Sequence, residues 1–250
     1  YNMSFIEPVV EAWIRRLYRK CDALVAPSES FAQVLRQQRM NYDIDIWSRG
    51  VDLEIFKPQQ SKVLNSAHPI FLYVGRVAVE KNINAFLEID LPGSKWVVGD
   101  GPAMKEIKEK YPLVNYLGVL NQYQLAEVYA AADVFVFPSK TDTFGLVLLE
   151  AMACGLPVAA YPVTGPIDVL GDSSAGVMNE DLRTACLHAL KIPREVARAH
   201  GRGQLRGRRL RARRRIDQQG LHLRQPLLWG RDRRLWPEAR RRASFGRMRN

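Results

Sequence analysis

Short unbroken runs of apolar residues alternate along this chain with longer segments in which apolar residues recur every three or four positions. The unbroken runs predict strands buried on both faces, and the recurring pattern predicts amphipathic helices. The predicted strands span residues 23–26, 45–47, 70–74, 95–98, 114–117, 134–137 and 158–160. The predicted helices span residues 8–24, 28–39, 82–88, 102–110, 122–132, 144–154 and 181–190.

This alternation of strands and helices predicts an α/β fold built on a Rossmann-like, doubly wound parallel sheet. Ligands of such sheets bind at the carboxyl ends of the strands. A glycine or proline marks four of these ends, at Gly75, Gly99, Gly118 and Pro138. We therefore expect these four turns to outline a ligand crevice along one edge of the sheet.

Charge is distributed unevenly over the 250 residues, whose formal net charge is +11. Residues 201–250 hold 17 arginines against three acidic residues, a formal charge of +14. Residues 1–200 hold 20 basic and 23 acidic residues, a formal charge of −3. The basicity belongs to the last fifth of the chain, so a nucleic acid is not an expected partner of the main body.

Cysteine and histidine follow no metal-binding or disulfide pattern. The three cysteines are widely spaced without a CxxC pair, and the four histidines lack ligand spacing. We expect neither a metal site nor a disulfide framework, and a cytoplasmic location fits this cysteine usage. No apolar run in the sequence reaches the ~18 residues of a membrane-spanning helix.

Two cations follow the predicted strand 70–74. Arg76 comes one residue after Gly75, and Lys81 comes five residues later. Cations at the carboxyl end of a strand suit a diphosphate, which an arginine can bind through two parallel hydrogen bonds. The alternative, two solvated surface charges, stays open.

The segment 138–157 holds the densest group of candidate residues. Asp142 lies in the loop before a helix, and Glu150 follows eight residues later, about two helical turns on. The exposed amides and the positive dipole end of that helix suit a phosphate. The residues that span the helix start are Thr143, Phe144, Gly145 and Leu146.

These two carboxylates also have a simpler interpretation. Asp142 would then cap the helix, and Glu150 would lie on the protein surface. However, Glu150 stands between Leu149 and Ala151 in an otherwise apolar helix. We therefore expect its carboxylate to face a polar group inside the protein.

Taken in order, these motifs carry a specific resemblance over about 150 residues. The motifs are Arg49–Asp52 with Phe56 and Pro58, Val74–Arg76 with Glu80 and Lys81, Gly99–Pro102, Leu117–Val119, Ala132–Val134 with Pro138 and Ser139, and the segment from Asp142 to Val158. The chain resembles the C-terminal, donor-binding half of a GT-B-fold, retaining glycosyltransferase of family 4, the glycosyl transferases group 1.

The resemblance implies a role for each matching residue. Arg76 and Lys81 would neutralise the donor diphosphate as it leaves, Asp142 would bind the sugar hydroxyls, and Glu150 would hold the ribose. The donor would also meet five residues largely through their backbone, with the base at Val119; these residues are Gly75, Val119, Phe144, Gly145 and Leu146. The family usually has Glu where this chain has Asp142, and this shorter side chain can alter sugar preference.

The implied reaction is transfer of a sugar from a UDP- or GDP-linked donor to a lipid, glycan or small-molecule acceptor, with retention and without a metal or bound cofactor. Two alternatives remain open. One is a sugar-nucleotide epimerase or phosphorylase-like enzyme of the same fold. The other is a non-enzymatic nucleic-acid binder that acts through the Arg-rich tail.

The resemblance also divides the chain. Residues 1–47 would be the remnant of a truncated acceptor-side domain, and residues 48–199 the nucleotide-sugar-binding domain. Residues 200–250 would be a disordered or frameshifted tail, because hydrophobic periodicity stops there. A chain of this kind would mainly bind donor.

The basic face of helix 8–24 would either contact the inner membrane surface or be solvated beside a missing domain. Both alternatives stay open at this point.

Overall fold

The computed structural model describes residues 7–21, 24–40, 44–46, 50–59, 67–142 and 144–204. They all lie within one compact unit that runs from Tyr1 to Ala212. The Arg-rich tail beyond residue 204 and the site candidate Thr143 lie outside the described residues, so the predictions about them stay predictions.

Six parallel strands form the main sheet. They are β3 (Ile70–Val74), β4 (Ser94–Val98), β5 (Asn115–Gly118), β6 (Val134–Phe137), β7 (Val158–Ala160) and β8 (Gly176–Met178). The strand order is β5-β4-β3-β6-β7-β8, and every neighbouring pair is parallel. This confirms the predicted fold class, and the order reverses between β3 and β6, as in dinucleotide-binding sheets.

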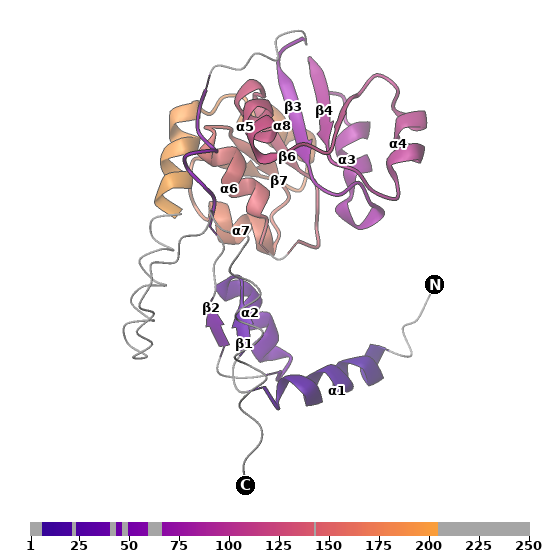
Figure 1. Cartoon of the computed structure of the whole chain (residues 1–250), viewed down its shortest axis with the longest axis vertical. Helices are drawn as coiled ribbons and strands as arrows, with labels where there is room; N and C mark the ends of the chain where they lie inside the picture. The colour runs from indigo at the N-terminus through magenta and orange to yellow at the C-terminus, as the bar shows by residue number, and fades with distance from the viewer. Residues whose placement is uncertain are drawn as a thin grey trace, which may run out of the picture. The chain divides into compact units, whose positions relative to one another are not determined.

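Helices cover both faces of this sheet, and Figure 1 shows β3, β4, β6 and β7 at its centre. The helices are η1 (Val79–Lys81), α3 (Ile83–Glu88), α4 (Met104–Lys110), α5 (Gln122–Ala131), α6 (Leu146–Ala153), α7 (Thr164–Leu170) and α8 (Leu182–Ala189), with a further helical segment at 194–204.

Successive side chains of β3 point to opposite faces. Leu72 and Val74 pack with α5 and α6, whereas Phe71 and Tyr73 pack with α3 and α8.

A smaller part of the described chain precedes the main sheet. It comprises α1 (Glu7–Tyr18), β1 (Leu24–Ala26), α2 (Glu29–Gln37) and β2 (Ile44–Ile46), with β1 and β2 paired in parallel. The predicted N-cap of α2 is confirmed, since the Ser28 hydroxyl accepts a hydrogen bond from the Phe31 amide at 3.3 Å. Ser30 also donates a hydrogen bond to Asp168 of α7.

Several predicted bounds are wrong, and η1, α7 and β8 were not predicted. Helix α1 ends at Tyr18, well before residue 24, and α4 begins two residues after Pro102. Helix α6 begins at Leu146, because Gly145 before it adopts a left-handed backbone with a φ of 67°. Helix α7 and strand β8 were missed, because a glycine and a proline open the seven-residue helix and the strand has only three residues.

Candidate functional site

The candidate site lies where the strand order reverses. Strands β3 and β6 are neighbours, with Leu72 paired to Phe135, so their carboxyl ends meet at one edge. The segments that follow them carry Arg76 and Lys81 on one side and Asp142 on the other. The predicted edge of the sheet therefore brings cations and a carboxylate from distant parts of the sequence together.

An ion pair joins the two segments. Lys81 Nζ lies 2.5 Å from Asp142 Oδ1, and the two side chains are 26% and 25% exposed. Two further hydrogen bonds hold the same two segments together. Asn82 Nδ2 donates to the Pro138 carbonyl at 3.1 Å, and Thr141 Oγ1 donates to the Glu80 carbonyl at 3.2 Å. Lys81 is thus held at the site with its charge partly open to solvent.

Arg76 is freer than Lys81. Its side chain is 65% exposed, and its guanidinium lies 3.9 Å from the Glu80 carboxylate. Its backbone carbonyl accepts a hydrogen bond from the Tyr73 hydroxyl at 2.8 Å. No sequence pattern marks Tyr73 as a site residue, because a tyrosine within a buried strand looks like a core residue.

The Tyr73 hydroxyl remains protonated and can serve only as a neutral group here. Burial raises the pKa of Tyr73 well above its usual range, and the nearby Asp142 and Glu80 carboxylates raise it further.

The turn after β4 packs directly on the turn after β3. Gly99 has a φ of +124°, and a Cβ built there would lie 2.0 Å from the Gly75 carbonyl oxygen. The Asp100 side chain accepts from the Gly101 amide at 2.7 Å, and the Val77 amide donates to the Asp100 carbonyl at 3.0 Å. Gly99–Gly101 therefore serves as a tight structural turn that shapes one wall of the edge.

The start of α6 lies beside the Asp142 loop. Gly145 is the N-cap residue, and its carbonyl accepts from the Leu148 amide at 2.9 Å. The Phe144 side chain is buried in the core, whereas Leu146 is partly exposed. A Cβ at Gly165 would lie 2.8 Å from the Asp142 carbonyl oxygen, so the first turn of α7 packs against this loop.

Glu150 faces a polar group inside the protein, as expected, and that group is a side chain of α5. The Tyr129 hydroxyl of α5 donates a hydrogen bond to Glu150 Oε2 at 3.1 Å. Burial raises the pKa of Glu150, and the hydrogen bond from Tyr129 opposes that shift. The described contacts therefore join Glu150 to α5, and they do not join it to the Lys81–Asp142 pair.

Val119 occupies the outer part of the same edge. It follows β5, which is separated from β3 by β4, and it is 76% exposed. A ligand that met both Val119 and the two cations after β3 would therefore have to extend across the ends of β3, β4 and β5.

Other features of the described chain lie elsewhere. One shallow cavity is lined by His68, Pro69, Asp133 and Arg194, with Leu190 and Ile192, at the opposite edge of the sheet. Among the described residues, no three His, Cys, Asp or Glu side chains gather as metal ligands would. Within the same residues, no helix has the length and apolar character to cross a membrane.

Two family models match the chain. The model of glycosyl transferases group 1 matches residues 68–192, which include the main sheet up to the end of α8. The model of glycosyltransferase family 4 matches residues 1–55, which include α1 to β2.

The curated proteins that resemble this chain in sequence are also glycosyltransferases. A GDP-mannose-dependent alpha-mannosyltransferase of Corynebacterium glutamicum is 31% identical over 191 residues, covering 71% of this chain and 45% of the relative. The sulfoquinovosyl transferase SQD2 of Arabidopsis thaliana is 31% identical over 70% of this chain and 38% of its own length. A D-inositol 3-phosphate glycosyltransferase of Nocardiopsis dassonvillei is 33% identical over 74% and 52%. The chain spans about half the length of the curated relatives it matches.

Solved structures share the fold. Anabaena Alr3699/HepE in complex with UDP and glucose superposes with a TM-score of 0.67 and 18% identity, over 82% of this chain and 65% of that one. Sucrose-phosphate synthase of Thermosynechococcus elongatus gives a TM-score of 0.66 with 22% identity, over 85% and 61%.

Proposed function

This chain belongs to the family of glycosyl transferases group 1, and we propose that it is the donor-binding half of an enzyme that transfers a sugar from a nucleotide-diphosphate sugar. The observation that carries this proposal is the Lys81–Asp142 pair at the point where the strand order reverses. Parallel sheets of this type bind nucleotides at that point.

The two cations would receive the donor diphosphate. Cleavage of the bond between the anomeric carbon and phosphate builds negative charge on the leaving diphosphate. Fixed cations stabilise that charge without reorganising, as an oxyanion hole does. Arg76 and Lys81 each face a carboxylate, Glu80 and Asp142, and a bound diphosphate would compete for both cations.

The remaining candidates would hold the rest of the donor. Asp142 would accept hydrogen bonds from sugar hydroxyls, and the backbone from Phe144 to Leu146 would meet sugar and phosphate. Glu150 would hold the ribose, Val119 would meet the base, and Gly75 would allow close approach. The named relatives include GDP-mannose-dependent enzymes and a structure with UDP, so both donors belong to the proposal.

We also propose that the reaction proceeds with retention, without a metal or bound cofactor, and in the cytoplasm, where peripheral contact with the inner membrane surface stays an open alternative. The acceptor would be a lipid, a glycan or a small molecule. We propose that this chain is competent mainly for donor binding and does not by itself transfer the sugar. Measurable transfer by this 250-residue chain would contradict the last point.

Calorimetry with UDP, GDP, ADP and their sugars tests donor binding. Arg76→Ala and Lys81→Ala should each cost ~1–3 kcal/mol of diphosphate affinity, roughly 5- to 150-fold, because each removes a charge-assisted contact. The matched control is Lys191→Ala, which removes the same charge from an exposed site after α8. It accounts for any general attraction of nucleotides to the basic chain, including the arginines of residues 201–250. Equal affinities in all three variants and the wild type would remove the site assignment.

A further inference from the structure

Glu150 occupies an unusual position for a carboxylate. Its neighbours Leu149 and Ala151 are fully buried, and its own side chain belongs to a helix whose other residues are apolar. A carboxylate in such surroundings requires a hydrogen-bond donor to offset lost hydration. The Tyr129 hydroxyl, 3.1 Å from Glu150 Oε2, supplies one.

Cys154 cannot replace Tyr129 in this role. Burial raises the pKa of the Cys154 thiol to about 12, and the Glu150 carboxylate adds to the shift. The thiol is therefore neutral, and its sulfur lies 4.0 Å from the Ala126 carbonyl oxygen. Thiols are weak donors, so the phenol is the strong neutral donor that faces Glu150.

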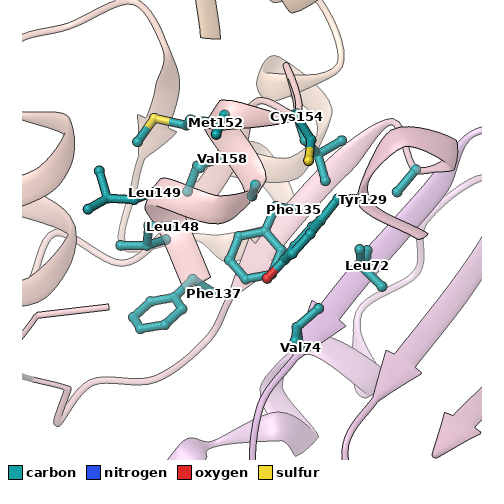
Figure 2. Packing of buried hydrophobic residues seen from close by; sticks show 14 of the residues in the cluster. Leu72, Val74, Tyr129, Phe135, Phe137, Leu148, Leu149, Met152, Cys154 and Val158 are labelled. Carbon is teal, nitrogen blue, oxygen red and sulfur yellow. The ribbon is translucent and has the colours of Figure 1, made fainter. Parts of the chain in front are cut away.

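The Tyr129 ring is held on two sides. It packs edge-to-face against Phe135 of β6, with ring centroids 5.8 Å apart, and against Phe56, with centroids 6.1 Å apart. Figure 2 shows the ring beside Phe135 in the buried cluster, with Cys154 near it. Such packing leaves the hydroxyl few alternative positions, because buried aromatic side chains occupy defined rotamers.

Phe56 does not belong to the sheet or its helices. It lies in the segment 50–59 that precedes the main sheet, where its amide donates to the Asp52 carbonyl at 2.9 Å. Val51 and Phe56 are buried in the same core cluster as Tyr129. Pro58 of the same segment lies close to Gly155 after α6, since a Cβ built at Gly155 would lie 3.6 Å from the Pro58 ring.

We propose that Tyr129 is a positioning residue for Glu150, and that Phe56 of the preceding segment holds the Tyr129 side chain in its orientation. The hydroxyl engages one carboxylate oxygen and orients the carboxylate toward the ribose. This inference rests on the proposed function, in which Glu150 binds the ribose hydroxyls. It makes the segment entering the domain contribute to the nucleotide site through its packing on Tyr129.

The test uses the 250-residue chain and two probes for each base. Dissociation constants are measured by calorimetry for GDP and UDP and for their 2′,3′-dideoxy forms, which lack the ribose hydroxyls. Tyr129→Phe should weaken the binding of GDP or UDP about tenfold, which corresponds to the loss of one hydrogen bond to a charged group. It should leave the dideoxy nucleotide unchanged, because only ribose hydroxyls depend on Glu150. Loss of equal size for both forms, or no loss, would overturn the proposal.

Two further variants test the role of Phe56. Phe56→Leu removes the ring that supports Tyr129 and should reduce the preference for the ribose form about threefold. Phe86→Leu is the matched control, because Phe86 is a fully buried ring in the cluster on the other face of the sheet. A control that changes the ribose preference as much as Phe56→Leu would overturn the role of Phe56. This pair also keeps the test available if Tyr129→Phe fails to fold.

Failure of the proposed function gives a different pattern. If the wild type binds neither nucleotide, or if Arg76→Ala and Lys81→Ala do not affect binding, both proposals fail. If these variants weaken binding and Glu150→Gln removes the ribose preference while Tyr129→Phe retains it, only the positioning role of Tyr129 fails.

Discussion

At each edge of the main sheet a contact between two polar side chains links the β3 segment to the β6 segment, but the two edges use this contact differently. At the carboxyl edge, Lys81 meets Asp142, and the contact leaves both side chains partly exposed. At the amino edge, His68 Nδ1 lies 2.6 Å from Asp133 Oδ2, and the same carboxylate oxygen accepts from the Ile70 amide at 2.7 Å.

A neighbouring cation at the amino edge is likewise engaged with backbone. The Arg194 guanidinium donates to the carbonyls of Ala132 at 2.6 Å and Ala130 at 2.9 Å, which lie at the end of α5. Charges at the amino edge thus satisfy backbone groups that would otherwise be unpaired, whereas charges at the carboxyl edge face each other and solvent. We infer that the amino edge serves stability and the carboxyl edge serves binding.

The largest expected effect comes from the turn that shapes the carboxyl edge. Gly99→Ala should lower the free energy of unfolding by about 4 kcal/mol or more, because its Cβ would overlap the Gly75 carbonyl oxygen. Urea denaturation measures the change. The matched control is Gly118→Ala, where φ is +69° but no atom lies within 4 Å of the added Cβ. That variant should lose only about 1–2 kcal/mol, and equal losses would show that contact with Gly75 is unimportant.

Asp133→Ala and Lys81→Met should separate the two edges. Asp133→Ala should cost about 1–3 kcal/mol of stability, because the buried Ile70 amide loses its acceptor, and should leave nucleotide affinity unchanged. Lys81→Met should change stability by less than about 1 kcal/mol, as expected for a partly exposed pair. It should, however, weaken the binding of the nucleotide. Thermal unfolding and calorimetry on both variants decide this. A variant that alters both quantities equally would erase the distinction between the edges.

The smallest effect on stability should come from Glu150→Gln, and its size depends on pH. Because burial raises the pKa of Glu150 above its ordinary value of 4.5, its favourable contribution is complete below that pH and is lost as pH rises through the folded-state pKa. Glutamine carries no charge to bury, so Glu150→Gln should be more stable than the wild type at neutral pH. The advantage should shrink toward about pH 4, where both side chains are neutral.

Melting temperatures across this pH range provide the measurement. A difference between Glu150→Gln and the wild type that does not vary with pH would show that burial of the Glu150 charge has no cost. Increased stability together with weaker nucleotide binding would mark Glu150 as a group that serves ligand binding more than folding.

Sequence patterns predicted most of the sheet because each long buried run forms a strand whatever its neighbours are. They failed at α7 and β8, where Gly165 and Pro166 interrupt the helical pattern and the strand is short. They located the carboxyl edge because parallel strands place their ends together. They did not identify Tyr73 and Tyr129, because their roles depend on partners brought close only by packing. The roles assigned to Arg76, Lys81, Asp142 and Glu150 toward a donor stay predictions.

The central pairing of β3 with β6 has a kinetic consequence. Ile70 and Asp133, which meet at its start, lie 63 positions apart in sequence. Closing so long a loop is slow compared with pairing strands within one βαβ unit. Each half of the sheet can therefore assemble locally before the two halves join along this seam. A nucleotide bound across the seam would contact only the finished assembly, and at concentrations above its dissociation constant it would stabilise the folded chain.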